Sequence, residues 1–232
     1  IKGANTPLAT PFDFYFTKIE ETARAGALSH LKLSVAKGLF LPEELTWSEG
    51  VEPAQMTCQV IAIKDSSTDP VVISSNQTLP TVTESIPFFG GIATIEGVDL
   101  SDEIIGCTVS WNLQPETLNT GQDPEPVRAD VVVAQKEVRL RTKNMLQLST
   151  FGMKGQALTS AAVIYFAKGD SAAARVASGT SQHCSLTINK EQVYCGPYSG
   201  DEGSTKTGEI VITVGDDLTN DPFVWSFAAT LP

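Results

Sequence analysis

Apolar and polar residues alternate along most of this chain, which is the pattern of half-buried β-strands. The clearest run is 31–35, where Leu31, Leu33 and Val35 alternate with two polar residues. Further runs of the same kind predict strands at 56–63, 71–73, 131–140, 161–167, 186–188, 210–214 and 223–227. These segments predict an all-β fold, mainly an antiparallel β-sandwich or barrel.

Two stretches favour short helices. The spacing of Thr17–Glu20 is that of a helix capping box, with a strand over 12–16 as the alternative for that region. Lys143–Leu148 contains good helix formers, with Thr142 as a possible cap and Gly152 as a stop. We therefore expect one or two short helices beside the strands.

An internal repeat organises the chain, with one unit at 30–80 and the other at 183–232, around a central segment at 81–182. Five features recur in the same order: His30 with His183, Pro42 with Pro197, Gly50 with Gly203, Asp69-Pro70 with Asp221-Pro222, and Leu79-Pro80 with Leu231-Pro232. Pro42 and Pro197 are each expected to close a short strand. A unit of this size cannot bury an apolar face alone, so we expect the units to pack on each other or on the central strands. Residues 17–232 are then one β domain, preceded by an extended arm at 1–16.

Charge narrows the classes of partner. The chain has 16 basic and 27 acidic residues, for a formal net charge of −11. A surface that binds duplex DNA is basic, so specific DNA binding is disfavoured, whereas an acidic wall lets DNA pass without holding it. The sequence contains no apolar run of roughly 20 residues, so we expect no membrane span, and it shows no secretory signal pattern.

Candidate chemistry is sparse. The sequence has no nucleophile elbow, no zinc-binding His motif, no phosphate loop and no calcium loop, so we expect no catalytic residue, metal or cofactor and no enzymatic activity. His30 and His183 occupy matching repeat positions, which favours hydrogen bonding at a strand end over catalysis. The cysteines form no CxxC pair and are expected to be buried free thiols, with a Cys184–Cys195 bridge across a hairpin as the alternative.

Two Pro/Gly-rich loops are predicted, at Gln114–Pro126 and Gly196–Gly208. Acidic residues gather in and beside the first loop, namely Glu116, Asp123, Glu125 and Asp130. They are candidates for a negatively charged lumen or for a loop between stacked rings, and a solvated loop is the simpler interpretation.

The last 130 residues or so resemble phage major tail (tail tube) proteins. One passage is Ile105–Trp111, then the polar loop 116–126, then Val131–Leu140 and a short helix after Arg141, which is similar to the strand, long loop, strand and helix of a tail tube subunit. Residues 185–212, with Ser199–Gly203 between strands, resemble the closing strands of such proteins.

The resemblance implies a structural virion protein whose copies pair sheet edges into stacked rings around a DNA conduit. Its partners would be copies of itself, in hexameric or trimeric rings, and other tail or virion proteins, and DNA would pass without specific binding. It would be assembled in the host cytoplasm. Two alternatives stay open: a capsid or decoration protein of a virus, and a cell-surface carbohydrate-binding or adhesion β-sandwich.

Overall fold

The computed structural model of this chain describes residues 12–16, 30–48, 52–65, 67–80, 87–101, 103–122, 125–133, 135–143, 156–170, 175–189, 191–196, 207–215 and 221–232. The described part contains strands and no helix. The strands are β1 (Phe12–Phe16), β2 (His30–Val35), β3 (Gly38–Ser48), β4 (Gln55–Ala62), β5 (Val72–Gln77), β6 (Phe88–Ile95), β7 (Val98–Asp99), β8 (Ile104–Ser110), β9 (Leu113–Leu118), β10 (Arg128–Val133), β11 (Lys136–Thr142), β12 (Gln156–Ala157), β13 (Ala162–Lys168), β14 (His183–Ile188), β15 (Glu191–Cys195), β16 (Gly208–Val214) and β17 (Phe223–Ala229).

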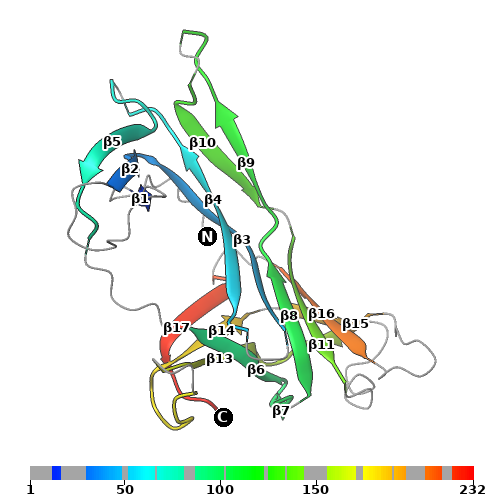
Figure 1. Cartoon of the computed structure of the whole chain (residues 1–232). Helices are drawn as coiled ribbons and strands as arrows, with labels where there is room; N and C mark the ends of the chain where they lie inside the picture. Colours follow the sequence, from blue (N-terminus) through cyan, green and yellow to red (C-terminus); the bar gives the residue numbers. More distant parts are fainter. Residues whose placement is uncertain are drawn as a thin grey trace.

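Two large antiparallel sheets form a sandwich in the lower part of the molecule (Figure 1). One has seven strands in the order β12-β15-β16-β11-β8-β3-β4, and the other has five in the order β17-β14-β13-β6-β7. The core between them takes every second residue of its strands, as a sandwich requires. Its most deeply buried members include Ile95, Val109, Val138, Leu140, Ile164, Leu186, Ile188, Ile210 and Ile212. The predicted all-β, mainly antiparallel fold is confirmed.

Two small sheets stand above the sandwich, β1-β2-β5 on one flank and the β9-β10 hairpin on the other (Figure 1). Strand β3 reaches both levels, because only Glu44–Ser48 pairs with β8 while the earlier residues pair with β4 alone. A minor core fixes the hairpin to this upper part of β3, and it consists of Leu39, Leu41, Ile63 and Ala129.

Three local predictions were wrong. Residues 131–140 were expected as one strand, but they belong to two, β10 and β11, which join different sheets. The predicted loop Gln114–Pro126 begins with most of β9, which pairs with β10 and packs Leu113 against the minor core. Pro42 does not close a strand, since β3 continues through it with a register shift beside it, where a proline is tolerated. The two helix predictions and most of the loop 196–208 lie outside the described residues.

Strand pairing is the same in two parts of the chain, which we call the N-terminal unit (β1–β5) and the C-terminal unit (β13–β17). In the N-terminal unit β2 pairs with β1 and β5, and β3 pairs with β4. In the C-terminal unit β14 pairs with β13 and β17, and β15 pairs with β16. The register also agrees, because Leu33 lies between Phe14 and Ile73 just as Leu186 lies between Ile164 and Trp225.

The agreement extends to an irregularity. The register of β2 against β5 shifts just after His30, and the register of β14 against β17 shifts just after His183. A bulge of this kind is specified locally by the strands that carry it, so its recurrence at the same row marks His30 and His183 as equivalent positions. By the same rows Pro42 corresponds to Cys195, not to Pro197 as the sequence comparison expected.

Candidate assembly surface

The β1-β2-β5 sheet has one polar and one apolar face. On the polar face the carboxylate of Asp13 accepts a 2.6 Å hydrogen bond from the Ser34 hydroxyl and lies 3.6 Å from the Lys32 ammonium. The opposite face carries only apolar side chains in the paired rows, because residues opposite each other in a sheet point the same way. They are Phe12, Phe14, Phe16, Leu31, Leu33, Val35 and Ile73.

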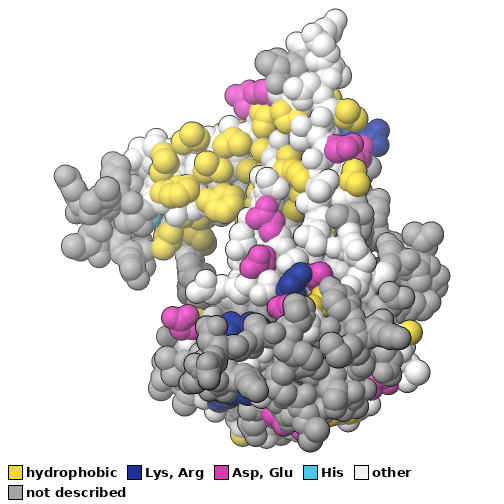
Figure 2. Space-filling view, turned by 90° about the vertical axis from the view of Figure 1, so that its right-hand side faces the viewer, with side chains coloured by type: hydrophobic (Ala, Val, Ile, Leu, Met, Phe, Trp, Pro, Cys, Tyr) yellow, Lys and Arg dark blue, Asp and Glu magenta, His cyan; other side chains and the backbone are white. Residues whose placement is uncertain are grey.

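Much of this apolar face is open to solvent. Within the described residues, eight of the twelve exposed large hydrophobic side chains belong to the N-terminal unit: Phe14, Phe16, Leu31, Phe40, Met56, Val71, Val72 and Ile73. Figure 2 shows hydrophobic side chains gathered over the upper part of the molecule, with few charged ones among them. Phe12 stacks on Phe40 of β3, which closes the inner end of the face and leaves the other end open.

The C-terminal unit buries the same rows. Phe166 is 2% exposed where its equivalent Phe16 is 51% exposed, and Cys184 is 4% exposed where Leu31 is 40% exposed. Trp225 is half-buried where Ile73 is 64% exposed. The two units therefore share an apolar surface, and among the described residues this surface is covered in the C-terminal unit and largely exposed in the N-terminal unit.

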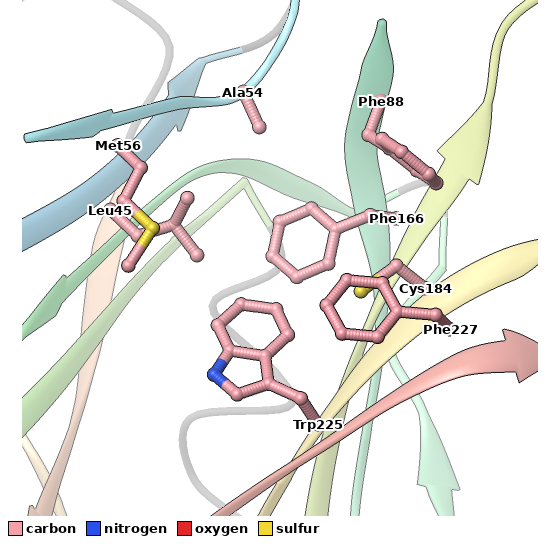
Figure 3. Close-up of a pocket in the computed structure, with 8 residues that line it drawn as sticks. All are labelled: Leu45, Ala54, Met56, Phe88, Phe166, Cys184, Trp225 and Phe227. Carbon is pink, nitrogen blue, oxygen red and sulfur yellow. The ribbon is translucent and has the colours of Figure 1, made fainter. Parts of the chain in front are cut away.

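An apolar pocket of about 270 Å³ marks where that cover ends (Figure 3). Its floor consists of Phe166, Cys184, Trp225 and Phe227 from the C-terminal unit, and Phe88 of β6 lies beside them. The opposite wall consists of Leu45, Ala54 and Met56, all from the β3–β4 part of the N-terminal unit. The pocket thus lies where the β3–β4 hairpin covers the end of the C-terminal unit's apolar face.

The acidic candidates lie on the β9-β10 hairpin and beside it. Glu116 and Asp130 are direct partners across the two strands, and they face away from the minor core. Like charges in such a pair repel, and Arg128 reduces the repulsion by lying 3.1 Å from Asp130. Glu125 lies 3.7 Å from Lys64, which follows β4. Asp123 lies outside the described residues.

Both histidines are fully buried at the start of equivalent strands. Nδ1 of His183 accepts a 3.0 Å hydrogen bond from the Lys168 amide, so Nε2 carries the proton and donates it to the Ala177 carbonyl at 3.0 Å. These bonds fix the segment before β14 to the end of β13, which is the strand-end role expected from the sequence.

Cys58, Cys107 and Cys184 are free thiols, so the alternative of a Cys184–Cys195 bridge was wrong. Cys184 lies in the five-stranded sheet and Cys195 in the seven-stranded one, and they do not share a hairpin. Burial raises the pKa of Cys184 to about 11 and raises that of Cys107 further. Such thiols are poor nucleophiles because little thiolate forms.

Among the described residues, no group of three or more His, Cys, Asp or Glu side chains is placed to hold a metal ion. Nor does that part of the chain contain a helix with the length and apolarity to cross a membrane. No protein-family model and no curated protein sequence matches this chain. The fold and its surfaces define an antiparallel β-sandwich-like protein with one covered and one open unit.

Sequence reasoning singled out the acidic residues as candidates and missed the open apolar face. The alternation of Phe12, Phe14 and Phe16 was visible, and it matches Ala162, Ile164 and Phe166 once the pairing is known. The shared Tyr-Phe pair at 15–16 and 165–166 was a signal that could have extended the repeat to β1 and β13.

Proposed function

We propose that this chain is a structural virion protein, a tail tube subunit whose copies assemble into stacked rings that form a DNA conduit. The observation that carries the proposal is the open apolar face of the β1-β2-β5 sheet. Soluble monomers rarely expose contiguous apolar patches beyond a few hundred Å², and a larger one marks an interaction site. A protein that works as an assembled wall has such a surface on every copy.

Sheet edges support the same proposal. Strand β4 ends the seven-stranded sheet on one side, and the two-residue β12 beside β15 ends it on the other. Copies joined at these edges, in hexameric or trimeric rings, continue the sheet from subunit to subunit. Closure into a ring removes the exposed edges, which otherwise promote uncontrolled pairing.

Glu116 and Asp130 point away from the minor core, and this outward face of the β9-β10 hairpin is the part assigned to the lumen or to the contact between rings. Carboxylates there repel phosphates, so DNA passes without specific binding. Other tail or virion proteins would cap the stack, and assembly would take place in the host cytoplasm. The proposal requires no catalytic residue, metal or cofactor.

Sedimentation velocity over a concentration series, followed by negative-stain microscopy, tests the proposal. Rings and tubes are the expected products. Closed shells or isolated trimeric knobs would favour a capsid or decoration protein instead. Monomers at every concentration and salt condition would refute self-assembly as the function of this chain.

A further inference from the structure

We propose that the apolar pocket between the β3–β4 hairpin and strand β17 binds a small, uncharged aromatic molecule of one or two rings. This binding site goes beyond the proposed function, because all of its walls come from one copy of the chain and it requires no assembly. The chemistry of the lining, the volume of the pocket and the contacts that hold its walls each limit what the pocket can take.

The lining of the pocket carries no charged side chain. Aromatic rings dominate the part that belongs to the central and C-terminal strands (Figure 3), and they are those of Phe88, Phe166, Trp225 and Phe227. The hydrogen-bond donors among the lining side chains are the Cys184 thiol and the Trp225 indole. A charged or strongly polar ligand would lose its water there without an equivalent partner, so the lining selects an uncharged, largely hydrocarbon ligand.

The rings of the floor favour an aromatic ligand over an aliphatic one. Trp225 stacks on Phe227 with ring centroids 6.2 Å apart, and its centroid lies 6.1 Å from that of Phe166. Aromatic pairs at separations of about 4.5–7 Å attract each other beyond the effect of burial. The thioether of Met56 lies on the opposite wall, and sulfur makes favourable contacts with ring edges. A ring in the pocket therefore gains contacts on both sides.

The volume of the pocket, about 270 Å³, sets the size of the ligand. An apolar cavity of roughly 150 Å³ is enough for benzene, so this pocket takes a substituted ring or two fused rings. Met56 and Phe227 are exposed and lie on opposite walls, so a ligand enters between them. A protein backbone is excluded, because the lining side chains offer its N–H and C=O groups almost no hydrogen-bond partner.

Both walls are held in place by contacts of the chain itself. The Ala54 amide donates a 2.7 Å hydrogen bond to the Phe88 carbonyl, which fixes the β3–β4 wall to β6. Trp225 pairs with the fully buried Leu186, which fixes the floor to the main core. A preformed pocket binds its ligand without first ordering its walls. The ligand touches both units, so its binding should also stabilise the contact by which the β3–β4 hairpin covers the C-terminal unit.

Methyl NMR of the full chain measures the binding. Protein with isotope-labelled methionine methyl groups is titrated with toluene at a concentration where it is monomeric, and Met56→Leu identifies the Met56 signal. The ring current of bound toluene should shift the Met56 methyl saturably, with a Kd on the order of 0.1–1 mM. Benzoate and benzylammonium carry the same ring with a charge, and they should bind at least about tenfold more weakly.

Substitutions in and beside the pocket locate the site. Figure 3 shows the Ala54 methyl group directed into the pocket, so Ala54→Leu should fill part of it and weaken toluene binding by about tenfold or more. Phe227→Ala removes part of the floor and should weaken binding by about fivefold. Val224→Ala is the matched control, since Val224 is also exposed on β17 but points to the opposite face from Trp225, and it should change the Kd by less than about twofold.

Each outcome decides for or against this site. A saturable shift that Ala54→Leu weakens and Val224→Ala preserves supports it, whether or not the chain assembles. If Met56 does not respond to toluene up to its solubility, the site is refuted and the proposed function still stands. Tighter binding of benzylammonium than of toluene would refute an uncharged ligand. A Met56 shift that follows protein concentration without toluene would show that a second copy fills the pocket, which also refutes the proposal.

Discussion

The N-terminal and C-terminal units share their strand pairing and differ in what covers them. In the C-terminal unit the second edge of β13 pairs with β6, and the second edge of β16 pairs with β11. In the described part of the chain, β1 and β4 are end strands and gain no such neighbour. Of the described N-terminal strands, β3 alone pairs with a central strand, β8, so the lower part of β3 joins the main core while the β1-β2-β5 face remains at the surface.

The difference shows that the burial of a strand is not decided by its own sequence. Leu33 and Leu186 have the same residue type, the same row and equivalent partners, yet only Leu186 is fully buried. Neighbouring strands determine the environment, since a face on a three-stranded sheet needs a second layer to leave water.

The largest expected effect compares these two leucines directly. Leu186→Ala should destabilise the chain by about 2.7–5 kcal/mol, because it leaves a cavity in the main core. Leu33→Ala should cost about 1 kcal/mol or less, since its surroundings are already partly hydrated. Urea unfolding of both variants, at a concentration where the protein is monomeric, measures the contrast. Equal losses would mean that the N-terminal face is as well packed as the C-terminal one.

A second effect concerns the part of the N-terminal unit that belongs to the main core. The indole of Trp47 in β3 lies flat against Gly90 of β6, and a Cβ built on Gly90 would meet ring atoms of Trp47. Gly90→Ala should therefore cost about 1–3 kcal/mol through overpacking. Gly121→Ala is the control, because a Cβ built there meets no atom within 4 Å. If Gly90→Ala were as stable as the control, the packing of Trp47 against β6 would be loose enough to admit a methyl group, and this part of β3 would not be a tightly packed part of the core.

Strand existence was predictable because it depends on local alternation. The runs around Leu33, Leu186 and Ile212 each became a strand at nearly the expected residues. The break between β10 and β11 was not predictable, since the residues between Val133 and Val138 include no Gly, Pro, Asn or Asp that would signal a turn. Which strands would share a sheet depends on distant partners that alternation does not encode.

The candidate surface was predicted only in part. Acidic residues such as Glu116 and Asp130 are visible as a cluster in the sequence, and the pairing of β9 with β10 places them side by side. The apolar face was not predictable, because Leu31 and Cys184 look equally suited to a core. Leu31 is exposed and Cys184 is buried because the sheet of Cys184 continues into β6, whereas β1 ends the sheet of Leu31.

Cysteine reactivity offers a third, smaller contrast between the units. Cys58 is half-buried, and its row corresponds to that of the fully buried Ile210. Partial burial, and secondarily the charge of Glu43, raise the pKa of Cys58, whereas burial raises that of Cys184 to about 11. A thiol reagent at pH 8 should label Cys58 at least about tenfold faster than Cys184, because thiolate is the reactive form.

The labelling is followed by mass spectrometry in a Cys195→Ser background, with Cys58→Ser as the control that removes the fast phase. Cys107, which is more deeply buried, should react last. Equal rates for Cys58 and Cys184 would contradict the view that the N-terminal unit is the more open of the two.

The smallest effect is a pH dependence in the link between the central strands and the C-terminal unit. Glu96, in the β6–β7 turn, accepts hydrogen bonds from the Thr159 amide, the Thr159 hydroxyl at 2.8 Å and the Ser160 hydroxyl at 3.1 Å, just before β13. These bonds favour the charged carboxylate and lower the pKa of Glu96. Its contribution to stability is complete above the unfolded pKa, near 4.5, and is lost as the pH falls through the lower folded pKa.

Glu96→Gln should therefore reduce stability slightly at pH 7 and flatten its decline below pH 4.5, as measured by thermal unfolding across that range. Asp99→Asn is the control for the same region. Hydrogen bonds from Ser101 lower the pKa of Asp99, and Ser101 lies outside the C-terminal unit. An unchanged acid decline in Glu96→Gln, with flattening in Asp99→Asn alone, would place the acid-sensitive contact within the turn. A flatter decline of stability with falling pH in Glu96→Gln would instead place the acid-sensitive contact between the β6–β7 turn and the residues before β13. The described part of the N-terminal unit has no equivalent of this contact.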